Sequence, residues 1–243
     1  MRFEIIRTEN YEKMSLFAAQ KMITKVKENP RSVLGLATGN TPVGLYKYLI
    51  LDYKTTGTSY KEVRTVNLDE YIGLDRDNKN SYFTFMRKRL FNHIDVKLHH
   101  TSIPNGVAPN LEEETVRYDK YIQKIGGIDI QILGIGHNGH IGFNEPGTSF
   151  KSRTHVVTLA ESTRNANARY FNNIDEVPTH AVTMGIQSIM DSKEIILLAS
   201  GTSKAEVIKR LVYGEITEEF PASVLRSHKK ATIIADQAAL QLI

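Results

Sequence analysis

The segment GIGHNGHIGFNEPG, residues 134–147, places groups that can exchange protons among glycines. Asn138, His140 and Glu145 stand in one short loop, where the glycines allow positive φ and the close approach of a ligand. The loop follows the apolar run of residues 128–133, which predicts a buried strand. In open α/β sheets, ligands bind beyond the carboxyl ends of the strands. An imidazole and a carboxylate at such a strand end indicate an acid–base catalytic site.

The same segment contains a GxGxxG pattern at Gly134, Gly136 and Gly139. In a dinucleotide site a helix must open directly after these glycines, so that its N-terminus can hold the pyrophosphate. Here the chain continues HIGFNEPGT, which predicts irregular structure, and we therefore expect no nicotinamide or flavin cofactor. A tight structural turn is the other interpretation, but it does not explain why a histidine and a glutamate share the turn.

A second loop, TGNTP at residues 38–42, stands between a predicted strand and a predicted helix. Thr38, Gly39 and Thr41 would offer hydroxyls and free backbone N–H groups at the start of that helix, which is a favourable place for phosphate. An ordinary helix cap by Thr41 or Asn40 remains an equal alternative when the loop is considered by itself.

A third loop contains two adjacent carboxylates, Asp69 and Glu70, at the end of a predicted strand. Neighbouring residues of extended chain point to opposite sides, so only one of the two can face a substrate unless the chain turns between them. One of them is therefore a candidate general base. The alternative is a solvated acidic pair on the surface.

Two cationic side chains could complete an anion site. Lys204 opens a predicted helix after the turn at residues 199–203, where its charge opposes the helix dipole, and a bound anion would explain it. Arg169, in a helical segment rich in asparagine, is the second candidate, although either residue alone could be ordinary surface. A phosphate site, a carboxylate base and a His–Glu pair together indicate proton transfer on a sugar phosphate.

Helical and strand-like segments alternate along the chain. We expect strands at residues 1–7, 33–37, 63–68, 128–133, 155–159, 194–199 and 231–235, and helices at residues 11–27, 43–53, 81–94, 111–125, 162–171 and 204–213. Strands separated by helices of this length imply parallel pairing with right-handed crossovers. The sequence therefore predicts one α/β domain over residues 1–243, a doubly wound, mostly parallel, Rossmann-like sheet with helices on both faces.

The composition argues against several classes of protein. Lysine and arginine number 31 against 27 acidic residues, and the net charge of +4 is spread along the chain, so nucleic-acid binding is not expected. No apolar run approaches the roughly 20 residues of a membrane span, and residues 1–7 lack the pattern of a signal peptide. The absence of cysteine excludes disulfides, zinc–thiolate sites and thiol catalysis. We expect a cytoplasmic protein that binds neither membrane nor nucleic acid.

Four motifs resemble those of the glucosamine-6-phosphate deaminase family, in order and spacing over nearly the whole chain: LATGNTP (36–42), VNLDEYIGL (66–74), GIGHNGHIGFNEPGTSF (134–150) and SRTHVVTL (152–159). The resemblance implies conversion of glucosamine 6-phosphate and water to fructose 6-phosphate and ammonia, in amino-sugar catabolism, without a redox cofactor or metal. It implies that Asp69 moves a proton between C2 and C1, and that His140 opens the sugar ring with support from Asn138 and Glu145. The residues implied to hold the phosphate or sugar are Thr38, Gly39, Thr41, Arg169 and Lys204.

The chemistry agrees with these roles. A base that takes a proton from the carbon beside an imine or carbonyl needs a carboxylate with a pKa near the ordinary value of about 4.3 or modestly above it. Histidine side chains in general give and take protons near neutrality, as the opening of a hemiacetal requires. Glu145 can orient the imidazole through one ring nitrogen and leave the other for the substrate.

Two positions depart from the family pattern. Asn138 stands where hexameric members have aspartate, and an amide can hydrogen-bond an imidazole without adding negative charge. His155 and Val157 stand where allosteric members have basic residues for an effector phosphate. We therefore expect a non-allosteric enzyme, either a monomer or a small homo-oligomer, and we expect residues 151–173 to form a lid.

Two other functions fit parts of the pattern. A 6-phosphogluconolactonase is similar in fold, but the sequence FNEP at residues 143–146 favours the deaminase, since a lactonase is not expected to have Glu145. A non-catalytic sugar-phosphate sensor would keep the anion site but could lose Asp69 and His140, and both are present.

Overall fold

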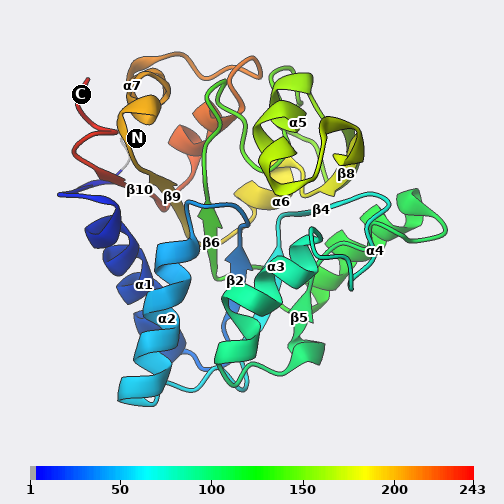
Figure 1. The fold of residues 1–243 in the computed structure, drawn as a ribbon. Coiled ribbons are helices and arrows are strands. Elements are labelled where there is room, and N and C mark those ends of the chain that lie inside the picture. Colours follow the sequence, from blue (N-terminus) through cyan, green and yellow to red (C-terminus); the bar gives the residue numbers. More distant parts are fainter. Residues whose placement is uncertain (1–3) are drawn as a thin grey trace.

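A seven-stranded parallel sheet forms the centre of the molecule (Figure 1), in a computed structural model that describes residues 4–243 apart from the side chains of Ser162 and Ala166. Its strands stand in the order β1-β10-β9-β6-β2-β3-β5. The strand order reverses between β2 and β6, which are parallel neighbours at the middle of the sheet. Such a switch point is where open α/β sheets bind ligands. The strands are β1 (Glu4–Thr8), β2 (Val33–Leu36), β3 (Arg64–Asn67), β5 (Thr101–Ser102), β6 (Ile130–Leu133), β9 (Ile195–Ala199) and β10 (Ala231–Asp236).

Helices cover both faces of this sheet. In β9, Ile196 and Leu198 belong to a core cluster with α1 (Tyr11–Glu28), α2 (Val43–Thr56) and α3 (Tyr82–Arg89). The alternate residues of β9, Ile195 and Leu197, belong to a second cluster on the other face. This alternation follows from the two-residue repeat of a strand, and it confirms the predicted doubly wound sheet. The second cluster includes residues of α4 (Leu111–Lys124), α6 (Ile186–Met190) and α7 (Ala205–Tyr213).

Capping residues define where several of the helices begin and end. The side chain of Asn10 caps α1 by accepting the backbone N–H of Lys13 at 2.9 Å. Within α1 the buried residues Met14, Ala18 and Met22 recur every four positions and so form one apolar face. Gly57 ends α2 in a left-handed conformation, with φ of 75°, that glycine adopts without steric cost. Among the described residues, no helix is long and apolar enough to cross a membrane.

A second, three-stranded antiparallel sheet lies beside the first, in the order β4-β8-β7. It consists of β4 (Asp69–Tyr71), β8 (His180–Thr183) and β7 (His155–Thr158). The expected parallel pairing of residues 155–159 is therefore wrong. The chain between β6 and β7 forms turns rather than a crossover helix, so β7 does not return to the central sheet.

Other differences concern short elements. The strand predicted at residues 1–7 is β1 from Glu4 onward, and its first three positions lie outside the described residues. The predicted helix at residues 81–94 ends at Arg89, and a 3₁₀ turn, Phe91–His93, follows it. The predicted helix at residues 162–171 is the shorter α5 (Glu161–Asn167), followed by the 3₁₀ turn Ala168–Tyr170. The elements β4, β5, β8 and α6 were not predicted, because their short lengths offer too little hydrophobic periodicity to recognise.

Candidate active site

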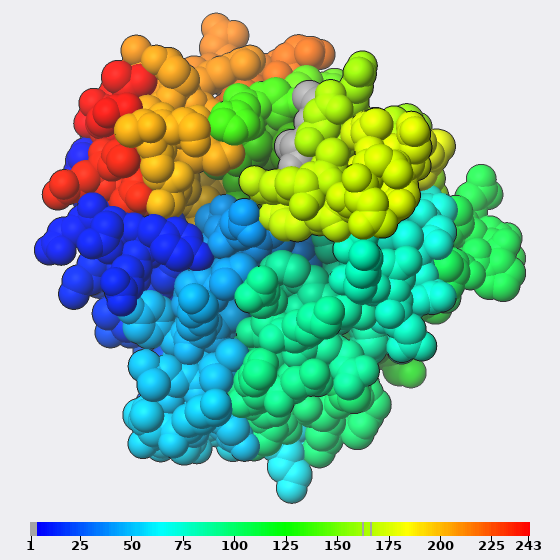
Figure 2. Space-filling view, viewed as in Figure 1, coloured from blue at the N-terminus to red at the C-terminus, as the bar shows by residue number. Residues whose placement is uncertain are grey.

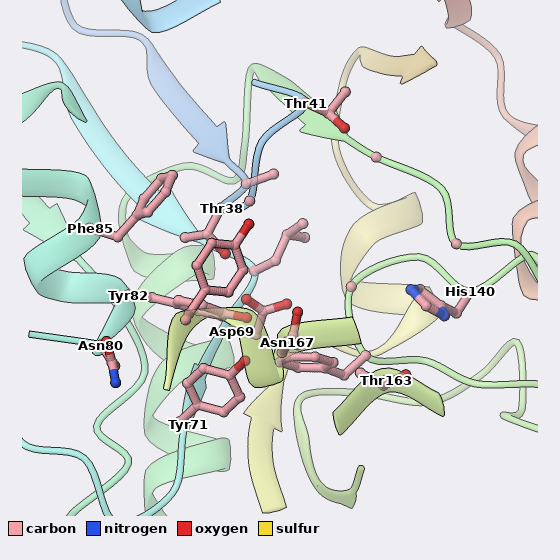
Figure 3. A pocket seen from close by; sticks show the side chains of 18 of the residues that line it. Thr38, Thr41, Asp69, Tyr71, Asn80, Tyr82, Phe85, His140, Thr163 and Asn167 are labelled. Atoms are coloured by element: carbon pink, nitrogen blue, oxygen red, sulfur yellow. The ribbon is translucent and has the colours of Figure 1, made fainter. Parts of the chain in front are cut away.

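A cavity of about 880 Å³ lies at the switch point of the central sheet (Figure 3). Loops after β2, β3 and β6 line it, together with the segment of α5 and the turn before α7. In the space-filling view the yellow-green surface of the α5 segment lies across from the teal surface of α3 (Figure 2). The cavity brings together eight of the nine residues singled out from the sequence: Thr38, Gly39, Thr41, Asp69, Asn138, His140, Arg169 and Lys204. The ninth, Glu145, contacts the imidazole of His140.

Asp69 occupies the junction between the two sheets. The backbone N–H of Leu68 donates to Leu36 of β2 at 3.2 Å, and the carbonyl of Leu68 accepts from Met184, after β8, at 2.7 Å. The chain thus leaves the parallel sheet at Leu68 and enters the antiparallel one with Asp69. Asp69 faces the cavity, while Glu70 points the other way and binds backbone N–H groups at the start of α3. The predicted opposition of the two carboxylates is confirmed, and the alternative of a surface pair is wrong because both are buried.

The environment of Asp69 makes it a stronger base than the sequence suggested. Burial and, to a smaller extent, the charge of the nearby Glu70 carboxylate together raise the pKa of Asp69 to about 8. The rings of Tyr71 and Tyr82 stand close to the Asp69 carboxylate (Figure 3), and Asp69 is 6% exposed. We expected a pKa no more than modestly above the ordinary value; the structure differs because the sequence did not reveal these two aromatic neighbours.

His140 and Glu145 form a pair on another wall of the cavity, with 3.4 Å between Nδ1 of His140 and Oε1 of Glu145. The Glu145 carboxylate also accepts the side-chain N–H of Asn138 at 2.6 Å and the hydroxyl of Thr163 at 2.8 Å. Burial alone would raise the pKa of Glu145, but the contacts with His140, Thr163 and Asn138 lower it to about 2. Glu145 is therefore ionised, and its charge can hold the imidazole in one orientation.

Asn138 has a different contact from the one that its family position suggested. Its amide group binds the Glu145 carboxylate, and its Oδ1 accepts the backbone N–H of His140 at 3.2 Å. Asn138 thus connects the carboxylate to the backbone of the histidine rather than to the imidazole. An amide can make both contacts because it has a donor and an acceptor.

Two of the three glycines in the GxGxxG pattern are required by the packing of the loop itself, without any bound nucleotide. A Cβ atom on Gly136 would lie 2.2 Å from the imidazole of His140, so only glycine lets the ring pack on this backbone. Gly139 has φ of 89°, and a Cβ there would meet the ring of Phe220 at 2.2 Å. Both glycines allow the loop to fold tightly under the histidine.

Two cationic side chains from distant parts of the chain, Arg169 and Lys204, line the cavity and form what we call its cationic part. Nζ of Lys204 donates to the carbonyl of Ile135 at 2.8 Å, and burial lowers the pKa of Lys204. The guanidinium of Arg169 stacks on the ring of Tyr170, with Cζ 4.9 Å from the ring centre. Tyr170 in turn donates its hydroxyl to Oδ1 of Asn40 at 3.0 Å, which connects the α5 segment to the loop after β2.

The loop of residues 38–42 lines the cavity just before the start of α2. Pro42 occupies the N-cap position of α2, and neither Thr41 nor Asn40 caps the helix with its side chain. The first two N–H groups of α2 have other partners: that of Val43 donates to the carbonyl of Asn40 at 3.3 Å, and that of Gly44 to the hydroxyl of Tyr11 at 2.8 Å. The alternative that Thr41 or Asn40 is an ordinary helix cap is therefore wrong. Thr38, Gly39 and Thr41 line the cavity beside this helix start, where the positive end of the helix dipole favours an anion.

Several cavity residues were missed by the sequence analysis. Tyr71 stood inside a motif that was singled out, but its ring packs 4.8 Å from that of Tyr82 in a way that no local pattern reveals. Thr163 and Asn167 lie on α5, where a hydroxyl or amide among polar residues gives no signal. Their positions depend on how α5 packs over the loop of residues 134–147.

A buried carboxylate base, an oriented imidazole and a cationic part, gathered at the switch point of a doubly wound sheet, define an α/β enzyme whose chemistry is proton transfer on an anionic substrate. The sequence profile of the glucosamine-6-phosphate isomerases/6-phosphogluconolactonase family matches residues 7–234. The chain belongs to this family.

Several known proteins are similar to this chain in sequence, in structure or in both. The glucosamine-6-phosphate deaminase of Halalkalibacterium halodurans is 58% identical over 99% of this chain and 98% of its own, and deaminase 1 of Bacillus subtilis is 54% identical over 98% and 99%. A solved structure of a monomeric glucosamine-6-phosphate deaminase is 53% identical and has a TM-score of 0.97, covering 99% of this chain and 100% of the other. The 6-phosphogluconolactonase of Trypanosoma cruzi, at 21% identity and a TM-score of 0.79 over 99% and 97% of the two chains, is similar in fold.

Proposed function

We propose that the protein is a glucosamine-6-phosphate deaminase, which converts glucosamine 6-phosphate and water to fructose 6-phosphate and ammonia. The observation that supports this best is the presence of two separate proton-transfer groups in one cavity, Asp69 on one wall and the His140–Glu145 pair on another. Ring opening and isomerisation act on different atoms of the sugar and so need two such groups. The relatives that share more than half of their residues with this chain are deaminases by name.

The phosphate would bind at the cationic part of the cavity. Lys204 and Arg169 supply positive charge, and the loop before α2 supplies the hydroxyls of Thr38 and Thr41. Gly39, with φ of 89°, lets the backbone curve around the anion. Charge-assisted hydrogen bonds of this kind are the strong ones, so the phosphate fixes where the sugar carbons lie.

Ring opening would use His140. The proton of the C1 hydroxyl leaves, the C1–O5 bond breaks, and O5 receives a proton, so the ring becomes an open-chain aldehyde without net loss or gain of protons. An imidazole can take one proton and supply the other. Ionised Glu145 holds the ring of His140 from its Nδ1 side, which leaves Nε2 for the sugar.

Asp69 would act on the open chain. Its carboxylate takes the proton from C2, the C2–H electrons form a C1–C2 double bond, and the electrons of the C1=O double bond move to O1, which takes up a proton. The nitrogen lone pair then forms a C2=N double bond while the C1–C2 double-bond electrons take the proton from Asp69 at C1, so C2 becomes an iminium. Water adds to C2, and the C2–N bond breaks to release ammonia and fructose 6-phosphate. A base with a pKa raised to about 8 by burial takes such a proton more readily than an ordinary carboxylate, once it is ionised.

Ammonia release tests the proposal. Purified protein mixed with glucosamine 6-phosphate should release ammonia and fructose 6-phosphate in equal amounts. Glucosamine without the phosphate is the matched control, because it lacks the anion that Lys204 and Arg169 would bind. Hydrolysis of 6-phosphogluconolactone without any deamination would contradict the assignment and favour the lactonase. Binding of glucosamine 6-phosphate without any turnover would favour a sensor.

The enzyme we propose is non-allosteric and monomeric. Val157, at a position where an effector site would need a cation, packs instead against the apolar cluster of Tyr71 and Phe143. His155 directs Nδ1 to the carbonyl of Arg153 at 2.8 Å. The relative with the TM-score of 0.97 is described as monomeric, which supports the same state for this chain.

A further inference from the structure

Glu70 is a buried carboxylate beside the cavity that the proposed reaction leaves without a role. It is 3% exposed. Its Oε1 accepts the backbone N–H groups of Tyr71 and Tyr82, both at 2.9 Å, and its Oε2 accepts that of Phe83 at 3.0 Å. Tyr82 and Phe83 are the first two residues of α3. One carboxylate therefore connects β4 to the start of α3.

Capping alone does not account for this connection. The first N–H groups of a helix lack partners within the helix. Ser81 already occupies the N-cap position of α3 and accepts the N–H of Thr84 at 3.1 Å. Glu70 belongs to β4 and not to α3. Its hydrogen bonds therefore hold the first turn of α3 in a defined position relative to β4, which a cap from the helix's own N-cap residue would not do.

The position of Tyr82 depends on this connection. Tyr82 stands in the first turn of α3, and its ring lies beside Asp69 on the cavity wall (Figure 3). Its ring centre is 4.8 Å from that of Tyr71, which follows Glu70 in β4. Displacement of the first turn of α3 would move the Tyr82 ring and admit water to Asp69.

Glu70 also acts on Asp69 through its charge. Burial raises the pKa of Asp69, and Glu70 is the neighbour whose negative charge raises it further. The tyrosines near Asp69 are neutral at physiological pH, since burial raises each of their pKa values. The tyrosines are Tyr71 on β4, Tyr82 on α3 and Tyr118 on α4. Burial raises the pKa of Glu70 itself to about 7, against the lowering by its backbone hydrogen bonds and by an arginine in the loop before α3, so Glu70 is mostly ionised at the pH where Asp69 titrates. The arginine is Arg76.

We propose that Glu70 is a positioning residue for this reaction: it fixes the start of α3 so that Tyr82 shields Asp69, and its negative charge strengthens Asp69 as a base. The inference rests on the proposed deaminase function and adds to it a residue that need not touch the substrate. The two adjacent carboxylates would thus have different roles: Asp69 moves the proton, and Glu70 holds Tyr82 in place and supplies the nearby negative charge.

Two variants separate position from charge. Glu70→Gln keeps the length of the side chain but loses its charge and one acceptor, whereas Glu70→Asp keeps the charge and falls short of α3 by one methylene. In Glu70→Gln the acidic limb of kcat/KM should move to lower pH by about half a unit or more, because a like charge near the base is gone. In Glu70→Asp the limb should stay in place. In both variants kcat should fall roughly 10- to 100-fold through misplacement, with KM within about threefold, since the phosphate site is untouched.

Glu114→Gln is the matched control. Glu114 is buried at 5% exposure, accepts the backbone N–H of Asn105 at 2.8 Å and lies outside the cavity. The same chemical change there should lower thermal stability without moving the acidic limb or kcat. Unchanged kcat and an unmoved limb in Glu70→Gln would overturn the inference, as would an equal shift of the limb in Glu114→Gln.

Two further outcomes have defined meanings. If Glu70→Gln does not fold, Tyr82→Ala takes its place: it should lose kcat without any change in the Glu70 side chain, and wild-type kcat in this variant would overturn the inference. If the wild-type protein releases no ammonia from glucosamine 6-phosphate, the proposed function fails, and the inference fails with it. An active wild type with an unaltered Glu70→Gln variant overturns the inference alone.

Discussion

The hydroxyl of Thr163 donates a 2.8 Å hydrogen bond to Oε1 of Glu145, the same oxygen that lies 3.4 Å from Nδ1 of His140. Thr163 belongs to α5, whereas Glu145 and His140 belong to the loop after β6. The segment that covers the cavity thus contacts the group that orients the imidazole. Residues 151–173 therefore influence the proposed ring-opening step through Thr163, whether or not they move as a lid.

Thr163→Val should lower kcat, because a valine of similar shape cannot donate to the Glu145 carboxylate. A hydrogen bond to a charged group contributes about 1.5–3 kcal/mol, so we expect a loss of roughly 10- to 100-fold in the rate of turnover. Thr163→Ser keeps the hydroxyl and should retain most of the wild-type rate. Steady-state ammonia release measures both variants, and equal activity of the valine variant and wild type would show that the contact has no catalytic role.

Asp69→Asn should abolish turnover while the phosphate site remains intact. Asparagine keeps the shape of the side chain but cannot accept the C2 proton, and loss of a general base typically costs about 10²–10⁴-fold in rate. Binding of glucosamine 6-phosphate, measured by calorimetry, should stay within about threefold of wild type. Near wild-type turnover in Asp69→Asn would show that another residue is the base.

The same substitution should change how stability depends on pH. The pKa of Asp69 rises from 3.8 to about 8 on folding, chiefly through burial. Below about pH 4 the Asp69 carboxyl is neutral in both the folded and the unfolded state, and it costs no stability. As the pH rises from about 4 to about 8 the carboxyl ionises in the unfolded state but not in the folded state, so the free energy of unfolding falls. The asparagine side chain of the variant would stay neutral throughout. The melting temperature of Asp69→Asn should therefore exceed that of wild type at pH 8, by roughly 2–4 °C for each kcal/mol of difference in a chain of this size, and match it near pH 4; an equal difference at both pH values would contradict the assigned environment.

His140→Gln should impair ring opening more than proton transfer at C1 and C2. The motivation is that His140 and Asp69 lie on separate walls of the cavity. Exchange of the C1 protons of fructose 6-phosphate with D₂O in the presence of ammonium needs Asp69 but no closed ring. We expect the variant to lose turnover of glucosamine 6-phosphate by about 10²-fold or more and to keep most of this exchange, which proton NMR measures. Equal losses of both activities would show that the histidine also takes part in the isomerisation.

Kinetics should be hyperbolic, without activation by N-acetylglucosamine 6-phosphate. An effector must bind one state of a protein better than another, and its phosphate needs charge-assisted hydrogen bonds to do so. Val157 packs in an apolar cluster and offers neither charge nor donor. Initial rates over a range of substrate concentrations, with and without the acetylated sugar phosphate, measure the effect. A sigmoidal curve that becomes hyperbolic when the compound is added would refute the prediction.

The sequence by itself determined the local parts of this protein. The four-residue repeat of Met14, Ala18 and Met22 predicts α1, and the apolar run of residues 128–133 predicts β6, because each pattern is complete within a few turns or residues. Asn138, His140 and Glu145 were recognised as one group for the same reason, since a single loop contains all three.

Only the tertiary structure decided which carboxylate faces the cavity and what surrounds it. Asp69 and Glu70 are equivalent in sequence, and their different environments come from distant residues, Tyr82 on α3 for both and Thr183 on β8 opposite Asp69. The antiparallel pairing of β7 and the contact of Thr163 with Glu145 likewise depend on chain segments meeting after they fold. Burial and charge at a site are sums over neighbours in space, so local sequence predicts which groups are present, and packing decides what their chemistry becomes.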